Sequence, residues 1–276
     1  KLDVYHRMGI VLEKELHKIP EAIEAHQNAL ELDPKSALTK RALESMLREI
    51  PVNEESLENR LNIANLLEPL FGDDEWSKLA KVLEVQIEAS DDAYSKVELM
   101  MRQADIYERN DIRKEKAFKV YSKAFLETPS NNLPREKMEE LASELELYND
   151  LAETYATCIE SCEDEIEAMQ FYERLAQIYE ELLGQNQKAA AAYEEILKRD
   201  PLHSKTIFAL EKIYTQAKDY PNLVRILNAR TEIATQLIDQ KDIYYRIADV
   251  QELELDDIDA AINAYQIGRA SCRERV

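Results

Sequence analysis

The sequence predicts an all-α protein, a solenoid built from antiparallel helix hairpins. Two observations point to this fold class. The 276 residues include only four glycines, whereas sheets and phosphate-binding loops use glycine for turns and for close backbone approach. Residues of similar type also recur along the chain at one fixed interval, as expected of a helical repeat protein. With 45% hydrophobic residues, the chain has enough apolar side chains to fold.

The repeat interval is 72 residues, and five separate registers agree on it. They are Ala104, Ala176 and Ala248; Tyr121, Tyr193 and Tyr265; Trp76, Tyr148 and Tyr220; Leu79, Leu151 and Leu223; and Pro129 and Pro201. Agreement between independent registers indicates a true internal repeat rather than a chance match. We therefore expect a 72-residue unit that cannot bury its apolar faces alone and stacks on its neighbours.

Residues 172–201 show what one such segment contains. Tyr172, Leu175 and Tyr179 lie at i, i+3 and i+7, which places them on one face of a helix. A second apolar stripe begins after a short turn at 184–186, and Pro201 ends it because proline lacks the backbone donor. Two amphipathic helices with a short turn between them predict an antiparallel hairpin.

These residues resemble the tetratricopeptide repeat. The family pattern W-x₂-L-G-x₂-Y, then A-x₃-F, then P, corresponds here to Tyr172, Leu175, Ala176, Tyr179, Ala189, Tyr193 and Pro201. Three more hairpins fit it: Tyr5, Met8, Gly9, Leu12, Ala22, His26, Ala29 and Pro34; Met100, Gln103, Ala104, Tyr107, Ala117, Tyr121, Ala124 and Pro129; and Tyr244, Ile247, Ala248, Ala261 and Tyr265. In all four the turn is one residue longer than in the family. The resemblance implies a right-handed superhelix, a tandem array of the bacterial type.

The 72-residue unit pairs one hairpin that fits this pattern with one that fits it less well. In the second kind, at 208–214 and 220–227, Leu223 replaces the usual small residue. We expect one solenoid at 1–266, with hairpins near 1–34, 35–91, 92–129, 130–163, 164–201, 202–237 and 238–266. The span from Pro34 to Trp76 is 42 residues, against 19 in the later copies, which predicts an extra helix near 51–72.

The two ends of the chain carry expectations of their own. Residues 267–276, IGRASCRERV, interrupt a helical pattern and resemble one translated reading frame of a common sequencing adapter, so we expect a non-native tail. Because residue 1 is lysine, we also expect that the natural N-terminus is missing. Localisation is therefore open, with the cytoplasm favoured and the periplasm as the alternative.

Composition excludes several classes of function. A net charge of −21 disfavours nucleic acid and anionic membrane surfaces, and no apolar run approaches the roughly 20 residues of a membrane span. The four histidines are far apart, and no phosphate loop or nucleophile elbow occurs. Cys158 and Cys162 lie one helical turn apart, and we expect them to be structural thiols. The alternative is a weak two-ligand metal site or a redox pair. We expect no enzyme, no metal, no cofactor and no small-molecule ligand.

The resemblance places the binding surface on the first helix of each hairpin, which lines a concave groove in that family. Counting from the small residue, the groove positions are Ile10 and Glu13, Asp105 and Glu108, Gln177 and Glu180, and Asp249 and Glu252. A glutamate recurs in all four copies, although exposed helix positions favour glutamate in any case. The family's Lys/Asn clamp for a C-terminal carboxylate is not matched, so a basic or amphipathic protein segment is the expected partner.

Three roles fit this interpretation. The leading hypothesis is a scaffold or adaptor that holds a protein segment in an acidic groove. The alternative is a docking or regulatory repeat region of a larger enzyme or secretion/assembly protein whose active domain lies elsewhere. The third is an architectural spacer without a groove ligand.

Overall fold

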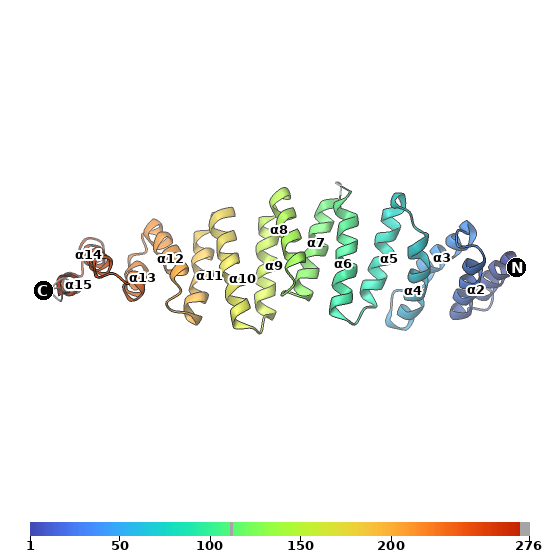
Figure 1. The fold of residues 1–276 in the computed structure, drawn as a ribbon, viewed down its shortest axis with the longest axis horizontal. Helices are drawn as coiled ribbons and strands as arrows, with labels where there is room; N and C mark the ends of the chain where they lie inside the picture. Colours follow the sequence, from blue (N-terminus) through green and yellow to red (C-terminus); the bar gives the residue numbers. More distant parts are fainter. Residues whose placement is uncertain (111–112, 271–276) are drawn as a thin grey trace. The chain divides into compact units, whose positions relative to one another are not determined.

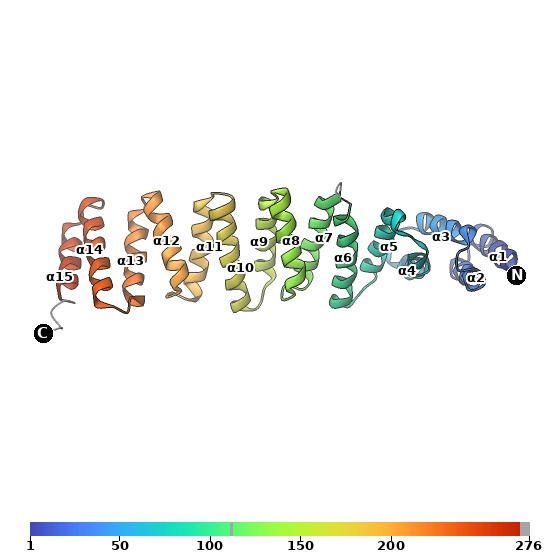
Figure 2. The ribbon, with the colours of Figure 1, turned by 45° about the horizontal axis from the view of Figure 1, so that its top comes forward.

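The computed structural model describes residues 1–110 and 113–270, which form helices joined by turns and contain no strands. They divide into two compact units, Lys1–Leu147 and Tyr148–Val276. Within each unit, helices that follow one another in the chain pack side by side (Figures 1 and 2). The predicted all-α fold of successive helix pairs is therefore confirmed. The predicted tail at 267–276 stays untested, because α15 continues through Ala270 and residues 271–276 lie outside the described part.

The first unit contains eight α-helices among its described residues. They are α1 (Leu2–Lys14), α2 (Ile19–Leu32), α3 (Ala37–Glu49), α4 (Glu54–Leu67), α5 (Trp76–Glu88), α6 (Ala93–Glu108), α7 (Lys114–Glu127) and α8 (Asn132–Leu145). Two short 3₁₀ turns, η1 (Glu68–Leu70) and η2 (Asp73–Glu75), connect α4 to α5. The pairs α1/α2 and α6/α7, which match the repeat pattern best, pack along most of their lengths.

The second unit is also built from consecutive antiparallel helices. It contains α9 (Tyr148–Ser161), α10 (Glu165–Gln177), α11 (Asn186–Arg199), α12 (Ser204–Ala217), α13 (Tyr220–Ile233), α14 (Leu237–Leu253) and α15 (Ile258–Ala270), with a π-helical turn, η4 (Ile178–Leu182), after α10. Figure 2 shows α12–α15 as consecutive upright helices. Here α10/α11 and α14/α15 are the pairs that fit the pattern best.

Small residues allow the helices of these pairs to approach closely. Ala104, Ala176 and Ala248, the register that defines the repeat, are each fully buried. Their counterpart Gly9 in α1 faces the ring of His26 in α2, and a Cβ on Gly9 would lie 2.7 Å from that ring. His26 itself occupies the position of Tyr121 and Tyr193 and is fully buried. In this hairpin, glycine in place of alanine leaves room for the buried His26 ring.

In the three matching hairpins whose turns are described, the extra residue is accommodated by a widened last turn of the first helix. Amides five residues further along donate to carbonyls near the ends of these helices: Leu16 to Val11 (3.2 Å), Leu183 to Ile178 (3.0 Å) and Leu255 to Val250 (3.2 Å). This i→i+5 bonding is the π-type turn that absorbs a single inserted residue. The equivalent turn at 111–112 lies outside the described residues.

Five of the described turns contain a residue with left-handed backbone conformation. In the matching hairpins these residues are His17, Gly184 and Asp256, with φ of 53°, 64° and 53°. Glu146 and Lys218, both with φ of 56°, end α8 and α12, where the next amide donates to a carbonyl five residues back, the Schellman arrangement. Two of these pairs are again 72 residues apart, so the repeat extends to the backbone dihedral angles.

The predicted extra helix is α4. The side chain of Asn53 caps its first turn by accepting from the Ser56 amide (3.0 Å), and Pro69 follows its end. Its residues Ile63, Ala64 and Leu67 are buried in one apolar cluster with residues of α2, α3 and α5. The insertion is therefore part of the core of the first unit rather than a surface loop.

Candidate functional site

The glutamates predicted to line the groove are bonded within their own hairpins. The hydroxyl of a tyrosine on the second helix donates to the carboxylate on the first, always across thirteen residues. These bonds are Tyr121 to Glu108 (2.8 Å), Tyr193 to Glu180 (3.3 Å) and Tyr265 to Glu252 (3.2 Å). Burial, followed by the bond to Glu108, raises the pKa of Tyr121 above its usual range, so this tyrosine remains a donor at every physiological pH.

Two of these glutamates also have a lysine partner on the first helix of the next hairpin. Lys137 of α8 lies 3.4 Å from Glu108, and Lys212 of α12 lies 2.7 Å from Glu180. The side chains of the two glutamates are only 24% and 12% exposed. Because a tyrosine and a lysine already satisfy them, Glu108 and Glu180 present less free negative charge than the sequence indicates.

The other predicted positions on α6, α10 and α14 differ in exposure. The Asp105 side chain is 49% exposed and pairs with Arg109 at 2.6 Å. Gln177 is half-buried and accepts from Arg174 at 3.3 Å. Asp249 and Glu252 are both exposed, and both accept from the single hydroxyl of Tyr265. Of the predicted positions, the structure thus brings together Asp249 and Glu252 through a shared partner.

In the first hairpin, Glu13 is in a different environment. It is buried at 8% exposure, while Ile10 is exposed. Because His26 stands where the other copies have tyrosine, Glu13 has no tyrosine bond and pairs instead with Lys14 at 2.9 Å. Lys14 also reaches Glu49 of α3 at 2.5 Å, so one ammonium serves two carboxylates.

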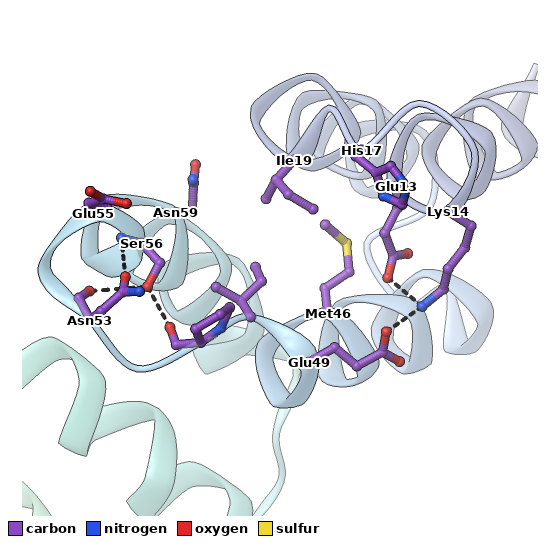
Figure 3. A pocket seen from close by; sticks show the side chains of 12 residues that line it. Glu13, Lys14, His17, Ile19, Met46, Glu49, Asn53, Glu55, Ser56 and Asn59 are labelled. Atoms are coloured by element: carbon purple, nitrogen blue, oxygen red, sulfur yellow. Dashed lines mark hydrogen bonds and ion pairs between the residues drawn. The ribbon is translucent and has the colours of Figure 1, made fainter.

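Glu13 lies in the wall of a hollow of about 460 Å³ between α1, α3 and the start of α4 (Figure 3). Met46 and Ile50, both buried, and Ile19 form its apolar part. The polar part is contributed by Glu13, Lys14, His17, Glu49, Asn53, Glu55, Ser56 and Asn59. The hollow combines an apolar floor with three carboxylates and one lysine.

A second polar cluster, in the other unit, is not apparent from the repeat pattern alone. Glu211 of α12 is buried at 7% exposure, and both its carboxylate oxygens accept from Arg230 of α13 at 2.7 Å. Arg246 of α14 also donates to Glu211. A hollow of about 320 Å³ adjoins this cluster, with the half-exposed ring of Phe208 on its wall. The signal in the sequence is Leu210 and Tyr214, which align Glu211 with the small residue of the other copies.

Among residues 1–110 and 113–270, no group of three or more His, Cys, Asp or Glu side chains is placed to hold a metal ion. None of the helices in this part of the chain is long and apolar enough to span a bilayer. Cys158 is buried and Cys162 half-buried, and both are free thiols. Burial raises the pKa of the Cys158 thiol to about 12, which keeps it protonated and unreactive.

The tetratricopeptide repeat family matches residues 168–203, which run from within α10 through α11. The predicted resemblance is confirmed. This segment contains Ala176, Glu180 and Tyr193, which are the small residue, the predicted groove residue and its tyrosine partner of one hairpin. No curated protein matches the chain in sequence.

The chain is similar to a number of solved structures, among them the following three. One is the TPR2AB domain of yeast Sti1 in a complex with pHSP90, with 17% identity over 99% of this chain and 92% of that chain, at a TM-score of 0.29. A tetratricopeptide repeat protein from Parabacteroides merdae has 10% identity, coverage of 99% and 94%, and a TM-score of 0.29. Human IFIT1, as a dimer with m7Gppp-AAAA, has 16% identity, coverage of 98% and 59%, and a TM-score of 0.24. TM-scores below 0.5 give no basis for transferring an arrangement or a ligand.

Proposed function

We propose that the chain is a protein-binding scaffold that holds a basic or amphipathic segment of a partner protein on the first-helix faces of its hairpins. The observation that supports this most directly is the hollow between α1, α3 and α4. It is large enough for one or two side chains of a partner, and it contains one of the predicted binding residues, Glu13.

The charges around this hollow favour a cationic side chain. Lys14 is shared by Glu13 and Glu49, and its hydrogen bond holds the pKa of Glu49 below its usual range, so that carboxylate stays ionised. Glu55, on the opposite wall, is exposed. A lysine or arginine side chain from a partner would place its aliphatic stem on Ile19 and its charged end among the carboxylates.

The other predicted positions are proposed as secondary contacts. Asp105, Asp249 and Glu252 present exposed carboxylates to a basic segment. Ile10, also exposed, offers apolar surface on α1, and Gln177 offers an amide. Glu108 and Glu180 are held by tyrosine and lysine partners, so we assign them mainly to hairpin geometry and only partly to the partner.

Binding of a labelled helical peptide tests this proposal. The peptide carries leucines on one face and lysines on its flanks, and a matched peptide has glutamate at each lysine position. We expect the lysine peptide to bind the whole chain more tightly, with an affinity that falls as salt is added, because exposed charge pairs are screened. Fluorescence anisotropy at several salt concentrations measures both effects.

A pair of variants with equal charge change locates the site. Glu13→Gln with Glu55→Lys changes the hollow, whereas Glu54→Gln with Glu58→Lys alters exposed residues of α4 that do not line it. The first variant should weaken the lysine peptide about tenfold, equivalent to ~1.4 kcal/mol, and the second should leave binding nearly unchanged. Equal losses in both variants would mean that only overall charge matters, and the proposed site would be wrong.

A further inference from the structure

A second hollow in the first unit has the opposite charge. It measures about 220 Å³ and lies between α3, α4 and α5. Its floor is apolar: Leu67 and Val82 are buried, and Leu47 and Phe71 are half-buried. Its rim includes Arg48, Lys78 and Lys81, with a single carboxylate, Glu44. We name this feature the α3–α5 cleft.

Two of its three cations have no carboxylate partner in the described part of the chain, although Arg48 also donates from Nε to the backbone carbonyl of Glu44 in its own helix at 3.2 Å. Lys78 pairs with Glu44 and Glu75, each at 3.0 Å. In contrast, neither Arg48 nor Lys81 has a carboxylate within 4 Å among the described residues, and both are exposed. Unpaired cations beside an apolar floor are unexpected in a chain with a net charge of −21, where carboxylates are plentiful.

The cleft exists because of the 51–72 insertion. Leu67 ends α4 and Phe71 follows η1, so the extra helix supplies half of the apolar floor. The ring of Phe71 lies under the ammonium groups of Lys40 at 4.7 Å and Lys78 at 5.8 Å, which fixes its orientation and keeps positive charge over it. The repeat units without the insertion have no counterpart to these two residues.

We propose that the α3–α5 cleft docks an acidic, amphipathic segment of a partner protein. One leucine or phenylalanine of the segment would contact Leu47 and Phe71, which are half-buried, and burial of their remaining apolar surface favours binding. Carboxylates on either side of it would pair with Arg48 and Lys81, of which the arginine can bind a carboxylate through two parallel hydrogen bonds. This site is separate from the acidic hollow of the proposed function and has the opposite preference for charge.

The experiment uses the whole chain and the labelled glutamate peptide that serves as the matched control for the acidic hollow. We expect Arg48→Glu with Lys81→Glu to weaken this peptide at least about tenfold. The matched control is Lys119→Glu with Lys123→Glu, which makes the same charge change at two exposed positions of α7 in the same unit. Circular dichroism of both variants should show unchanged helix content.

Four results would overturn the proposal. They are equal binding of the glutamate peptide to both double variants, no binding to the wild type, displacement by anionic lipid vesicles, and self-association of the chain that the cleft variant abolishes. The last two would show that a membrane or a second copy occupies the cleft instead. Failure here is distinguishable from failure of the proposed function, because the lysine peptide and the Glu13→Gln, Glu55→Lys variant report on the other hollow.

Discussion

Acidification should destabilise the first unit through His26. This side chain is fully buried, and neither of its ring nitrogens has a hydrogen-bond partner among the described residues. Its ring centre lies 5.8 Å from that of His6. Burial, and secondarily the charge of His6, lower the pKa of His26 from 6.5 to about 4. The folded chain therefore keeps this imidazole neutral at a pH where the unfolded chain protonates it.

The sign and size of the effect follow from this difference. Between pH 6.5 and pH 4 the unfolded state binds more protons, so the free energy of unfolding falls as the pH is lowered. Each unit of pKa difference is equivalent to about 1.4 kcal/mol, and lowering the pH from 7 to 5 should cost about 2 kcal/mol. Carboxylates with lowered pKa, such as Glu68 and Glu195, stay ionised over that range and do not contribute.

Urea unfolding at pH 7 and pH 5 measures this loss. The only tryptophan, Trp76, lies in α5, so its fluorescence follows the unit that contains His26. The control is His26→Leu, which removes the buried imidazole and keeps His6 and His17. We expect the wild type to lose about 2 kcal/mol more than the variant between the two pH values. Equal losses would refute the assignment of the effect to His26.

Three further predictions concern the packing of the hairpins, each measured as a change in unfolding free energy. Gly9→Ala should destabilise by about 1–3 kcal/mol, because its Cβ would lie 2.7 Å from the His26 ring, and adding His26→Ala should recover part of the loss. Ala176→Leu, at a fully buried crossing, should also cost about 1–3 kcal/mol, while exposed Ala191→Leu should stay within about 0.5 kcal/mol. Glu211→Gln should cost about 1–3 kcal/mol, since its two arginine partners lose their anion; an unchanged midpoint would show that water replaces it.

The sequence was sufficient for the fold because repetition averages out local ambiguity. Ala104, Ala176 and Ala248 could be assigned to helix crossings because three copies agree, and all three are fully buried. The insertion could be recognised as a helix from its length and its bounding proline and glycine. The contacts of this helix could not be predicted, because the sequence contains no second copy of it from which to infer what Leu67 and Phe71 touch.

The candidate sites were less predictable, because they depend on contacts between helices. The recurring glutamate could be read from the sequence, but the bond from Tyr121 to Glu108 depends on the closeness of two helices rather than on either residue alone. Likewise, Lys137 follows Glu108 by 29 residues and Lys212 follows Glu180 by 32. The two spacings differ by about one helical turn, so the 72-residue repeat does not reveal that both lysines have the same role. The free charge of Arg48 and Lys81 is visible only once every neighbouring carboxylate has been placed.

The left-handed residues that close the hairpins have a consequence for how such a chain can change. Histidine, glutamate, lysine and aspartate all occupy this conformation here, with glycine at only one of the five positions. A non-glycine residue there costs roughly 1 kcal/mol or more, and each hairpin tolerates that cost because the packing of its two helices holds the turn. The tips are therefore free to change side chain, and with it local charge, without altering the geometry of the repeat. Glycine at any one of the four non-glycine positions would remove this conformational cost and stabilise the chain.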